Sequence, residues 1–176
     1  YALDNTKGRI FAYDFQGNML YAFGGHGYKA GLFMNPSAIE DLGDSLLVTD
    51  QKLGTITQFT LTDYGKMIND GLAEYKKGNY EESANIWRKV LKHNGNYDQA
   101  YIGIGRALLR EKNYKEAMDY FELKLDAKNY SKAFKLYREV WFEENIGTIL
   151  IIIAILILLG FGVGFVKKAR REVEKG

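Results

Sequence analysis

The spacing of apolar and polar positions changes twice along this chain, and each change predicts a different kind of structure. Up to residue 62, short β-rich or alternating runs are separated by Gly, Asn and Asp, a pattern typical of strands joined by tight turns. From Tyr64 the apolar positions recur with helical spacing. A long uncharged stretch follows near the C-terminus. We expect the strands at residues 1–3, 9–13, 19–23, 46–49 and 55–61.

The uncharged stretch, residues 146–165, reads IGTILIIIAILILLGFGVGF. A helix of this length covers roughly 30 Å, the thickness of the hydrocarbon core of a bilayer. Lipid offers no hydrogen bonds to the backbone, so the segment should be helical throughout. The core helix of a soluble domain rarely runs this long without a polar residue. We therefore predict a single transmembrane helix at residues 143–166.

Residues on either side of this stretch predict its orientation. Trp141 and Phe142 precede it, where amphipathic aromatics lie at the membrane interface. An excess of Lys and Arg marks the cytoplasmic side, so we expect residues 167–176 to form a basic cytoplasmic tail and the N-terminal part to be extracellular. Because an outside N-terminal part needs an export signal and the chain begins with Tyr1, we expect it to be a piece of a longer protein. The cations after the stretch that we place at the membrane interface are Lys167, Lys168, Arg170 and Arg171.

Three glycines in the inner part of the predicted span suggest a second contact. Gly160 and Gly164 have the Gly-x-x-x-Gly spacing and share one helix face, and Gly162 lies to the side. Small residues at this spacing let two helices in lipid approach closely. Glycine is also common in spanning helices without such a role, so both interpretations stay open.

The middle of the chain contains a repeat with a spacing of 34 residues. Gly71 corresponds to Gly105, and Trp87 corresponds to Phe121. In each unit a helix with a small residue is followed by a turn and a second helix that begins at Tyr, which is the tetratricopeptide arrangement. We expect the small residue to let the two helices approach and the aromatic to fill the gap between them. The helical region should cover residues 63–142, with units at 64–97 and 98–129 and a partial unit at 130–142 that lacks its first helix.

The first unit departs from the repeat consensus at Asp70, Glu74 and Ser83. The partial unit carries an aromatic stripe with spacings of four, three and four residues on one helix face. We favour packing of this stripe against Phe121 and its neighbours over a ligand groove. The stripe consists of Tyr130, Phe134, Tyr137 and Trp141.

The first third contains a different repeat, with an offset of 46 residues. Asp4 corresponds to Asp50, and Gly8 corresponds to Gly54. A period of about 40 to 50 residues with four strands per unit is typical of propeller blades. The glycines and aspartates of residues 1–62 resemble those of the NHL-repeat propeller, which implies about one and a half blades here.

Some members of that propeller superfamily are lactonases or lyases with His and acidic metal ligands. The propeller part of this chain has one histidine, His26, in a Gly-rich loop, and we interpret it as a surface residue. Asp4 and Asp50 are expected to accept hydrogen bonds from turn amides instead of binding metal. The fold class predicted is therefore multi-domain: a partial all-β NHL-type propeller, α-helical tetratricopeptide hairpins and one transmembrane helix.

Composition excludes several kinds of chemistry. The chain has no cysteine, which rules out disulfides, thiolate metal sites and cysteine nucleophiles. The net charge of +2 gives no case for nucleic acid. We find no nucleophile elbow, phosphate loop or metal-ligand spacing, so we predict a protein that is not an enzyme and needs no metal or cofactor.

This order of parts resembles surface proteins of Clostridia-like Gram-positive bacteria, in which a propeller, tetratricopeptide units and one anchoring helix precede a Yip-type membrane domain. The resemblance implies a link with carbohydrate importers of the ATP-binding-cassette class. We expect a non-catalytic, membrane-anchored scaffold that contacts the bilayer and other membrane subunits, such as importer permeases or the solute-binding protein. Tyr97 and Tyr120 are candidate partner-binding residues, chosen as surface aromatics not needed for packing.

Two alternatives remain open. The first is an extracellular propeller enzyme, of the lactonase or lyase kind, whose active site lies in blades not present here. The second is a periplasmic assembly factor, if the host has an outer membrane.

Overall fold

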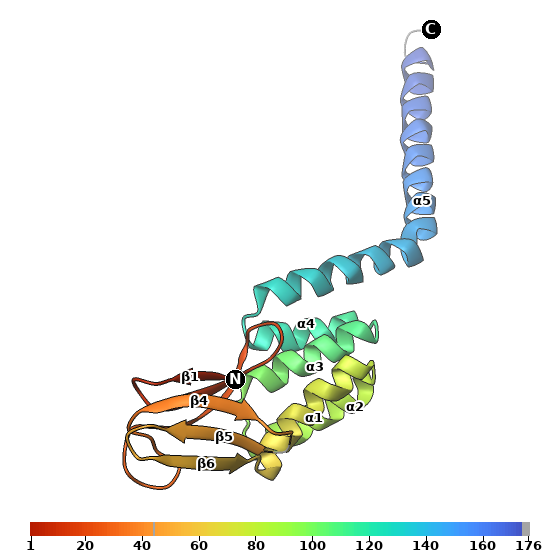
Figure 1. Ribbon diagram of the computed structural model, residues 1–176. Helices are drawn as coiled ribbons and strands as arrows, with labels where there is room; N and C mark the ends of the chain where they lie inside the picture. The colour runs from red at the N-terminus through yellow and green to blue at the C-terminus, as the bar shows by residue number, and fades with distance from the viewer. Residues whose placement is uncertain (44, 174–176) are drawn as a thin grey trace.

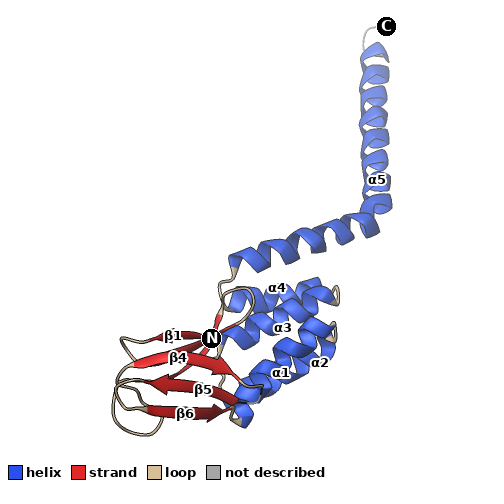
Figure 2. Cartoon of the chain, in the orientation of Figure 1, coloured by secondary structure: helices blue, strands red, loops and turns tan. Residues whose placement is uncertain are grey.

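The computed structural model describes the backbone of residues 1–43 and 45–173 and the side chains of residues 1–43, 45–164 and 167. Strands form the N-terminal part and helices the remainder, and one long helix leaves the body of the molecule (Figures 1 and 2). The strands are β1 (Ala2–Asp4), β2 (Arg9–Tyr13), β3 (Met19–Gly24), β4 (Pro36–Asp41), β5 (Ser45–Asp50) and β6 (Thr55–Thr60). The helices are α1 (Asp63–Lys77), α2 (Tyr80–His93), α3 (Asp98–Arg110), α4 (Tyr114–Leu123) and α5 (Ala127–Val173).

The strands form two antiparallel sheets of three strands each, in the orders β1-β2-β3 and β4-β5-β6. Side chains from both sheets share one small core of Ile10, Phe33, Leu46 and Val48. The rings of Phe23 and Phe59 join the two sheets edge to face, with centroids 5.0 Å apart. Each sheet has one strand fewer than the four expected for a propeller blade, and the described residues show no closed propeller.

Five of the six strands coincide closely with the sequence prediction, and β4 was missed. Its sequence, PSAIED, does not alternate and begins with Pro36. Proline lacks an N–H donor and is therefore tolerated at the first residue of an edge strand, which is where Pro36 lies.

The 46-residue repeat is visible in the backbone. Gly8 and Gly54 both have a φ of 65°, a left-handed conformation that glycine adopts without strain. The Asp4 carboxylate accepts the N–H of Lys7 at 2.9 Å, so the prediction of turn binding is confirmed. Asp50 accepts four backbone N–H groups, those of Met34, Asn35, Lys52 and Leu53, at 2.6–3.1 Å.

The Asp50 carboxylate is buried, and burial alone raises its pKa. The four N–H donors together outweigh burial and hold the pKa below the ordinary 3.8. The charged form of Asp50 therefore ties the segment before β4 to the turn after β5.

The 34-residue repeat predicts the packing of the four short helices correctly. A Cβ added at Gly71 would lie 2.9 Å from Cε2 of Trp87, and one added at Gly105 would lie 2.6 Å from Cε1 of Phe121. Both rings are buried, so each small residue allows the two helices of its unit to approach. Gly103, which the sequence analysis missed, is equally tight, because its Cβ would lie 2.5 Å from Nε1 of Trp87.

Two of the three departures of the first unit from consensus, Ser83 and Glu74, have local explanations. Ser83 replaces the small apolar residue found at Ala117, and its hydroxyl donates to the carbonyl of Gly71 at 2.7 Å inside the core. Glu74 accepts hydrogen bonds from Lys77 and Asn79, both at 2.6 Å, at the end of α1.

Three residues separate the end of α4 from the start of α5, and α5 packs against α4. Among the described residues, no other helix lies between α4 and α5. Helix α5 itself packs against α4, in the place where the missing first helix of the partial unit would lie. The predicted packing of the aromatic stripe is only partly correct. Tyr130 contacts the core and Ala133, between the stripe positions, is fully buried, whereas Phe134 and Trp141 are 44% and 43% exposed.

The C-terminal part of α5 stands clear of the rest of the chain (Figure 1). Its apolar stretch is unburied and is long and apolar enough to cross a membrane. Helix α5 continues as one helix from Ala127 through the apolar stretch.

Candidate binding site

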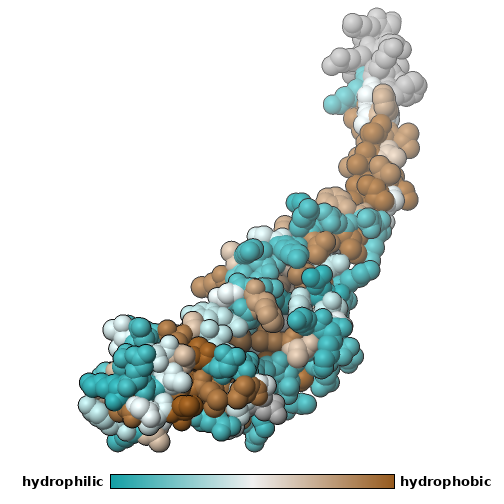
Figure 3. Space-filling view, viewed as in Figure 1, coloured by the Kyte–Doolittle hydropathy of each residue, from teal (hydrophilic) through white to brown (hydrophobic). Residues whose placement is uncertain are grey.

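A cavity of about 970 Å³ lies between the two sheets and helices α1 and α3. Apolar side chains gather at this junction on the visible surface (Figure 3). Helix α1 along its whole length, strand β3, the turn before it, and strands β5 and β6 supply most of the walls. The aromatic residues that line the cavity are Tyr1, Tyr13, Phe15, Tyr21, Phe23, Phe59, Tyr64, Tyr75 and Trp87.

One wall of the cavity is a hairpin that docks on the helices. We call residues 9–24, which comprise β2, β3 and their turn, the docking hairpin. In its turn, the Asp14 carboxylate accepts the N–H groups of Gln16 and Asn18, both at 2.8 Å. The same carboxylate lies 3.8 Å from the guanidinium of Arg106 on α3, and both side chains are largely buried. The ion pair therefore links the folded turn to the second tetratricopeptide unit.

A bulge in the docking hairpin supplies the second link between the hairpin and the helices. The pairing of β2 with β3 skips Leu20, which has no partner opposite it on β2. The Leu20 carbonyl instead accepts the hydroxyl of Tyr97 at 2.8 Å. Tyr97 also packs against Trp87 and Tyr64.

Tyr97 is therefore needed for packing, and the assumption behind its choice as a free surface aromatic is wrong. The reason is that the docking hairpin covers the residue that joins α2 to α3, a contact 77 positions apart in the sequence. Burial raises the pKa of Tyr97 above its ordinary value, which keeps the hydroxyl protonated as a donor.

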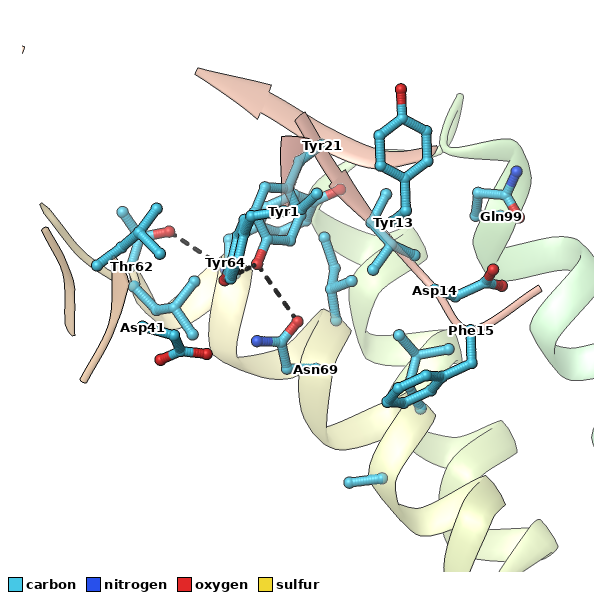
Figure 4. Close-up of a pocket in the computed structure, with 18 of the residues that line it drawn as sticks. Tyr1, Tyr13, Asp14, Phe15, Tyr21, Asp41, Thr62, Tyr64, Asn69 and Gln99 are labelled. Atoms are coloured by element: carbon cyan, nitrogen blue, oxygen red, sulfur yellow. Dashed lines mark hydrogen bonds between the residues drawn. The ribbon is translucent and has the colours of Figure 1, made fainter. Parts of the chain in front are cut away.

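Polar groups of the cavity gather near the start of α1 (Figure 4). The Tyr21 hydroxyl donates to Oδ1 of Asn69 at 3.4 Å and lies 3.2 Å from the Tyr1 hydroxyl. Burial raises the pKa of Tyr21 as well. The Tyr64 hydroxyl is buried and has no hydrogen-bond partner among the described residues. A buried hydroxyl without a partner is energetically costly.

None of the predicted site residues whose side chains the structure describes, Tyr97 included, lines the cavity. Tyr120 is half-buried on α4 beside Tyr101, with ring centroids 6.4 Å apart. The described glycines of the span have open space around them, and their contact role stays a prediction; they are Gly160, Gly162 and Gly164.

The predicted interface residues are only partly described. Trp141 and Phe142 are exposed next to the apolar stretch, with ring centroids 5.4 Å apart. Lys167 is exposed as well. The side chains of Lys168, Arg170 and Arg171, like residues 174–176 of the tail, lie outside the described residues.

Within the part of the chain that the structure describes, no group of three or more His, Asp or Glu side chains is placed to hold a metal ion. His26 is exposed in its loop, as expected. Of the charged residues that line the cavity, Asp14 and Arg106 are paired with each other, and the others are Asp41 and Lys76. The aromatic walls can hold an apolar group, and the hydroxyls of Tyr1 and Tyr21 can bond to a polar atom beside it.

Comparison with known proteins agrees with the helical packing. The sequence model of the tetratricopeptide repeat family matches residues 69–132. This part of the chain is therefore similar to tetratricopeptide repeats. The match includes the Gly71–Trp87 and Gly105–Phe121 pairs and the first turns of α5. No curated protein and no solved structure shows significant similarity to this chain.

Proposed function

We propose that this protein is a non-catalytic, membrane-anchored scaffold whose cavity binds an apolar segment of a partner protein. The observation that supports this most strongly is the aromatic cavity of about 970 Å³ between the sheets and the repeats. Its size is at the upper end of the range for ligand sites, about 300–1,000 Å³, and suits several side chains of a protein segment. Tetratricopeptide repeats in general mediate contacts between proteins.

Anchoring places this cavity near a membrane. The apolar stretch of α5 supplies one membrane-spanning helix, with the repeats on the extracellular side and the basic tail in the cytoplasm. The partner is then a subunit of a membrane complex, and the resemblance stated above favours a carbohydrate importer. We propose that the span also contributes through the Gly160–Gly164 face, whose open surface would let a second helix approach closely.

Phe15 is the residue best suited to test the cavity. It lines the cavity at the hairpin turn, yet it is 97% exposed, so its replacement removes no core packing. Tyr28 is a matched control, because it is 74% exposed in a loop that does not line the cavity. A photo-crosslinking amino acid at position 15, in native membranes, should capture a membrane-complex subunit that position 28 does not.

Equal capture at the two positions, or capture at neither, would contradict the cavity as the binding site. Mass spectrometry of the crosslinked product identifies the partner: an importer permease or solute-binding protein supports the importer assignment, and any other protein corrects it. Protease added to wall-free cells tests the orientation, because it should remove the repeats and spare the tail.

A further inference from the structure

Helix α5 bends between its polar and apolar parts (Figure 1). Before the apolar stretch, the side-chain amide of Asn145 donates to the Trp141 carbonyl at 2.7 Å. This is the carbonyl that the main chain of residue 145 uses in a regular helix, and a side chain that competes for it is a recognised cause of bending. The bend separates residues 127–142, which we call the elbow helix, from the apolar stretch.

The elbow helix has two opposite sides. The side toward α4 contains Tyr130, Ala133 and Tyr137, which are fully or partly buried. Helix α4 lies on the side of the elbow helix that points away from the span (Figure 1). The opposite side therefore faces the plane that the span enters.

The residues on the side facing this plane recur at spacings of three and four, and all of them are exposed. Residues 127–138 carry four cations and no acidic residue. Glu139 and Glu143, the acids that follow, lie on the flank with Lys132, and Glu139 pairs with Lys135 at 3.9 Å. The residues that form this side are Lys128, Ser131, Lys135, Arg138 and Phe142.

Exposed aromatics border the cations on the other flank. Phe134 and Trp141 are seven residues apart, which places them on the same edge of the helix. Arg138 lies over the Phe134 ring at 5.9 Å from the centroid. Cations together with large aromatics on the outer side of a helix are typical of a helix that lies in the headgroup layer of a membrane.

We propose that the elbow helix lies along the membrane surface, with its cations on anionic headgroups and Phe134, Trp141 and Phe142 in the interfacial layer. The occupant of this side is the bilayer itself, because the same helix continues into the apolar span a few residues later. The helix is about 24 Å long, so it holds the tetratricopeptide stack flat against the membrane instead of on a flexible tether. This inference rests on the membrane anchoring of the proposed function.

The absence of cysteine from the sequence makes a spin-label test direct, since each introduced cysteine is the sole label site. The full chain is placed in nanodiscs of phosphatidylcholine and phosphatidylglycerol. Test labels replace Ser131 and Phe134. An aqueous control replaces Asp119, which is exposed on α4, and a lipid control replaces Ile152 in the span. Accessibility to oxygen and to a water-soluble nickel complex is measured at each position.

The labels at Ser131 and Phe134 should show an oxygen-to-nickel ratio several-fold above that at Asp119 and below that at Ile152. Two results overturn the inference while anchoring holds. In the first, both test labels match Asp119 while Ile152 reports lipid. In the second, both test labels are shielded from both reagents, as beneath another protein. An aqueous signal at Ile152 instead refutes the anchoring itself.

A second measurement separates the lipid contact from a merely exposed helix. Trp141 on the elbow helix and buried Trp87 are the two tryptophans of the chain. Brominated lipids should quench the part of the fluorescence that Trp141→Phe removes and should leave Trp87 unaffected. Unchanged Trp141 emission with brominated lipid would overturn the inference.

Discussion

Replacing Gly105 with alanine tests the packing rule on which the helical repeat is built. The added Cβ would lie 2.6 Å from Cε1 and 3.0 Å from Cδ1 and Cζ of Phe121. Carbon atoms pack best at about 3.5–4.0 Å, so these contacts are too short by up to about 1 Å. The Phe121 ring is completely buried and cannot swing into solvent.

Two opposing effects decide the magnitude. Overpacking a core in this way costs about 1–3 kcal/mol. Alanine in a helix interior is better than glycine by about 1 kcal/mol, which offsets part of that cost. We therefore expect Gly105→Ala to lower the free energy of unfolding by up to about 2 kcal/mol.

The assay is urea unfolding of the full chain in detergent, followed by the fluorescence of Trp87 in a Trp141→Phe background. Trp141 is exposed, so its removal leaves the core unchanged. A double-mutant cycle with Phe121→Leu isolates the clash, because a smaller side chain leaves room for the new methyl group. The coupling should be favourable by about 1 kcal/mol or more. Effects that add within about 0.5 kcal/mol, or a stabilised Gly105→Ala variant, would refute the reasoning.

Three further predictions concern local structure. Unless another measurement is named, each is tested by the free energy of unfolding in urea. Lys112 has a φ of 64° at the position equivalent to Gly78. Lys112→Gly should raise the free energy of unfolding by up to about 1 kcal/mol, because it removes left-handed strain. Gly78→Ala should lower the free energy of unfolding. Asp50→Asn should lower the free energy of unfolding at neutral pH. The difference from the unchanged protein should shrink as the pH falls below 3.8, because the stability that a lowered pKa provides is lost on protonation. A difference that does not change with pH would contradict this. Tyr97→Phe should cost about 1–2 kcal/mol and speed hydrogen exchange in the docking hairpin, while Tyr101→Phe, which loses an exposed hydroxyl bond to a carbonyl, should have little effect on either.

What could be predicted from the sequence was local. The glycine–aromatic pairs of the repeats lie sixteen residues apart in adjacent helices, so a period of 34 is enough to predict their contact. The span follows from length and charge alone. Strand β4 was missed because PSAIED lacks the alternation by which strands are recognised.

What could not be predicted depends on contacts between distant segments. Asp14 meets Arg106, and Leu20 meets Tyr97, only after the docking hairpin has packed on the repeats. No periodicity connects residues so far apart, and the cavity is a product of that packing. The bend in α5 was missed for a different reason. Between Ser131 and Ile146 the sequence has neither Gly nor Pro, and the side chain of Asn145 competes for a carbonyl instead.

The contacts between these parts determine how a partner would meet the protein. The docking hairpin is held by α3, Lys124 after α4 pairs with Asp98 on α3 at 2.7 Å, and Ala133 of the elbow helix is buried against the helical core. Each step is a packed or charged contact, with no flexible linker between them. The cavity is therefore fixed in height and direction relative to the start of the span. On the proposed anchoring, a partner that fills the cavity would present its segment at that height above the membrane, which would favour a membrane-bound or membrane-docked protein over a freely diffusing one.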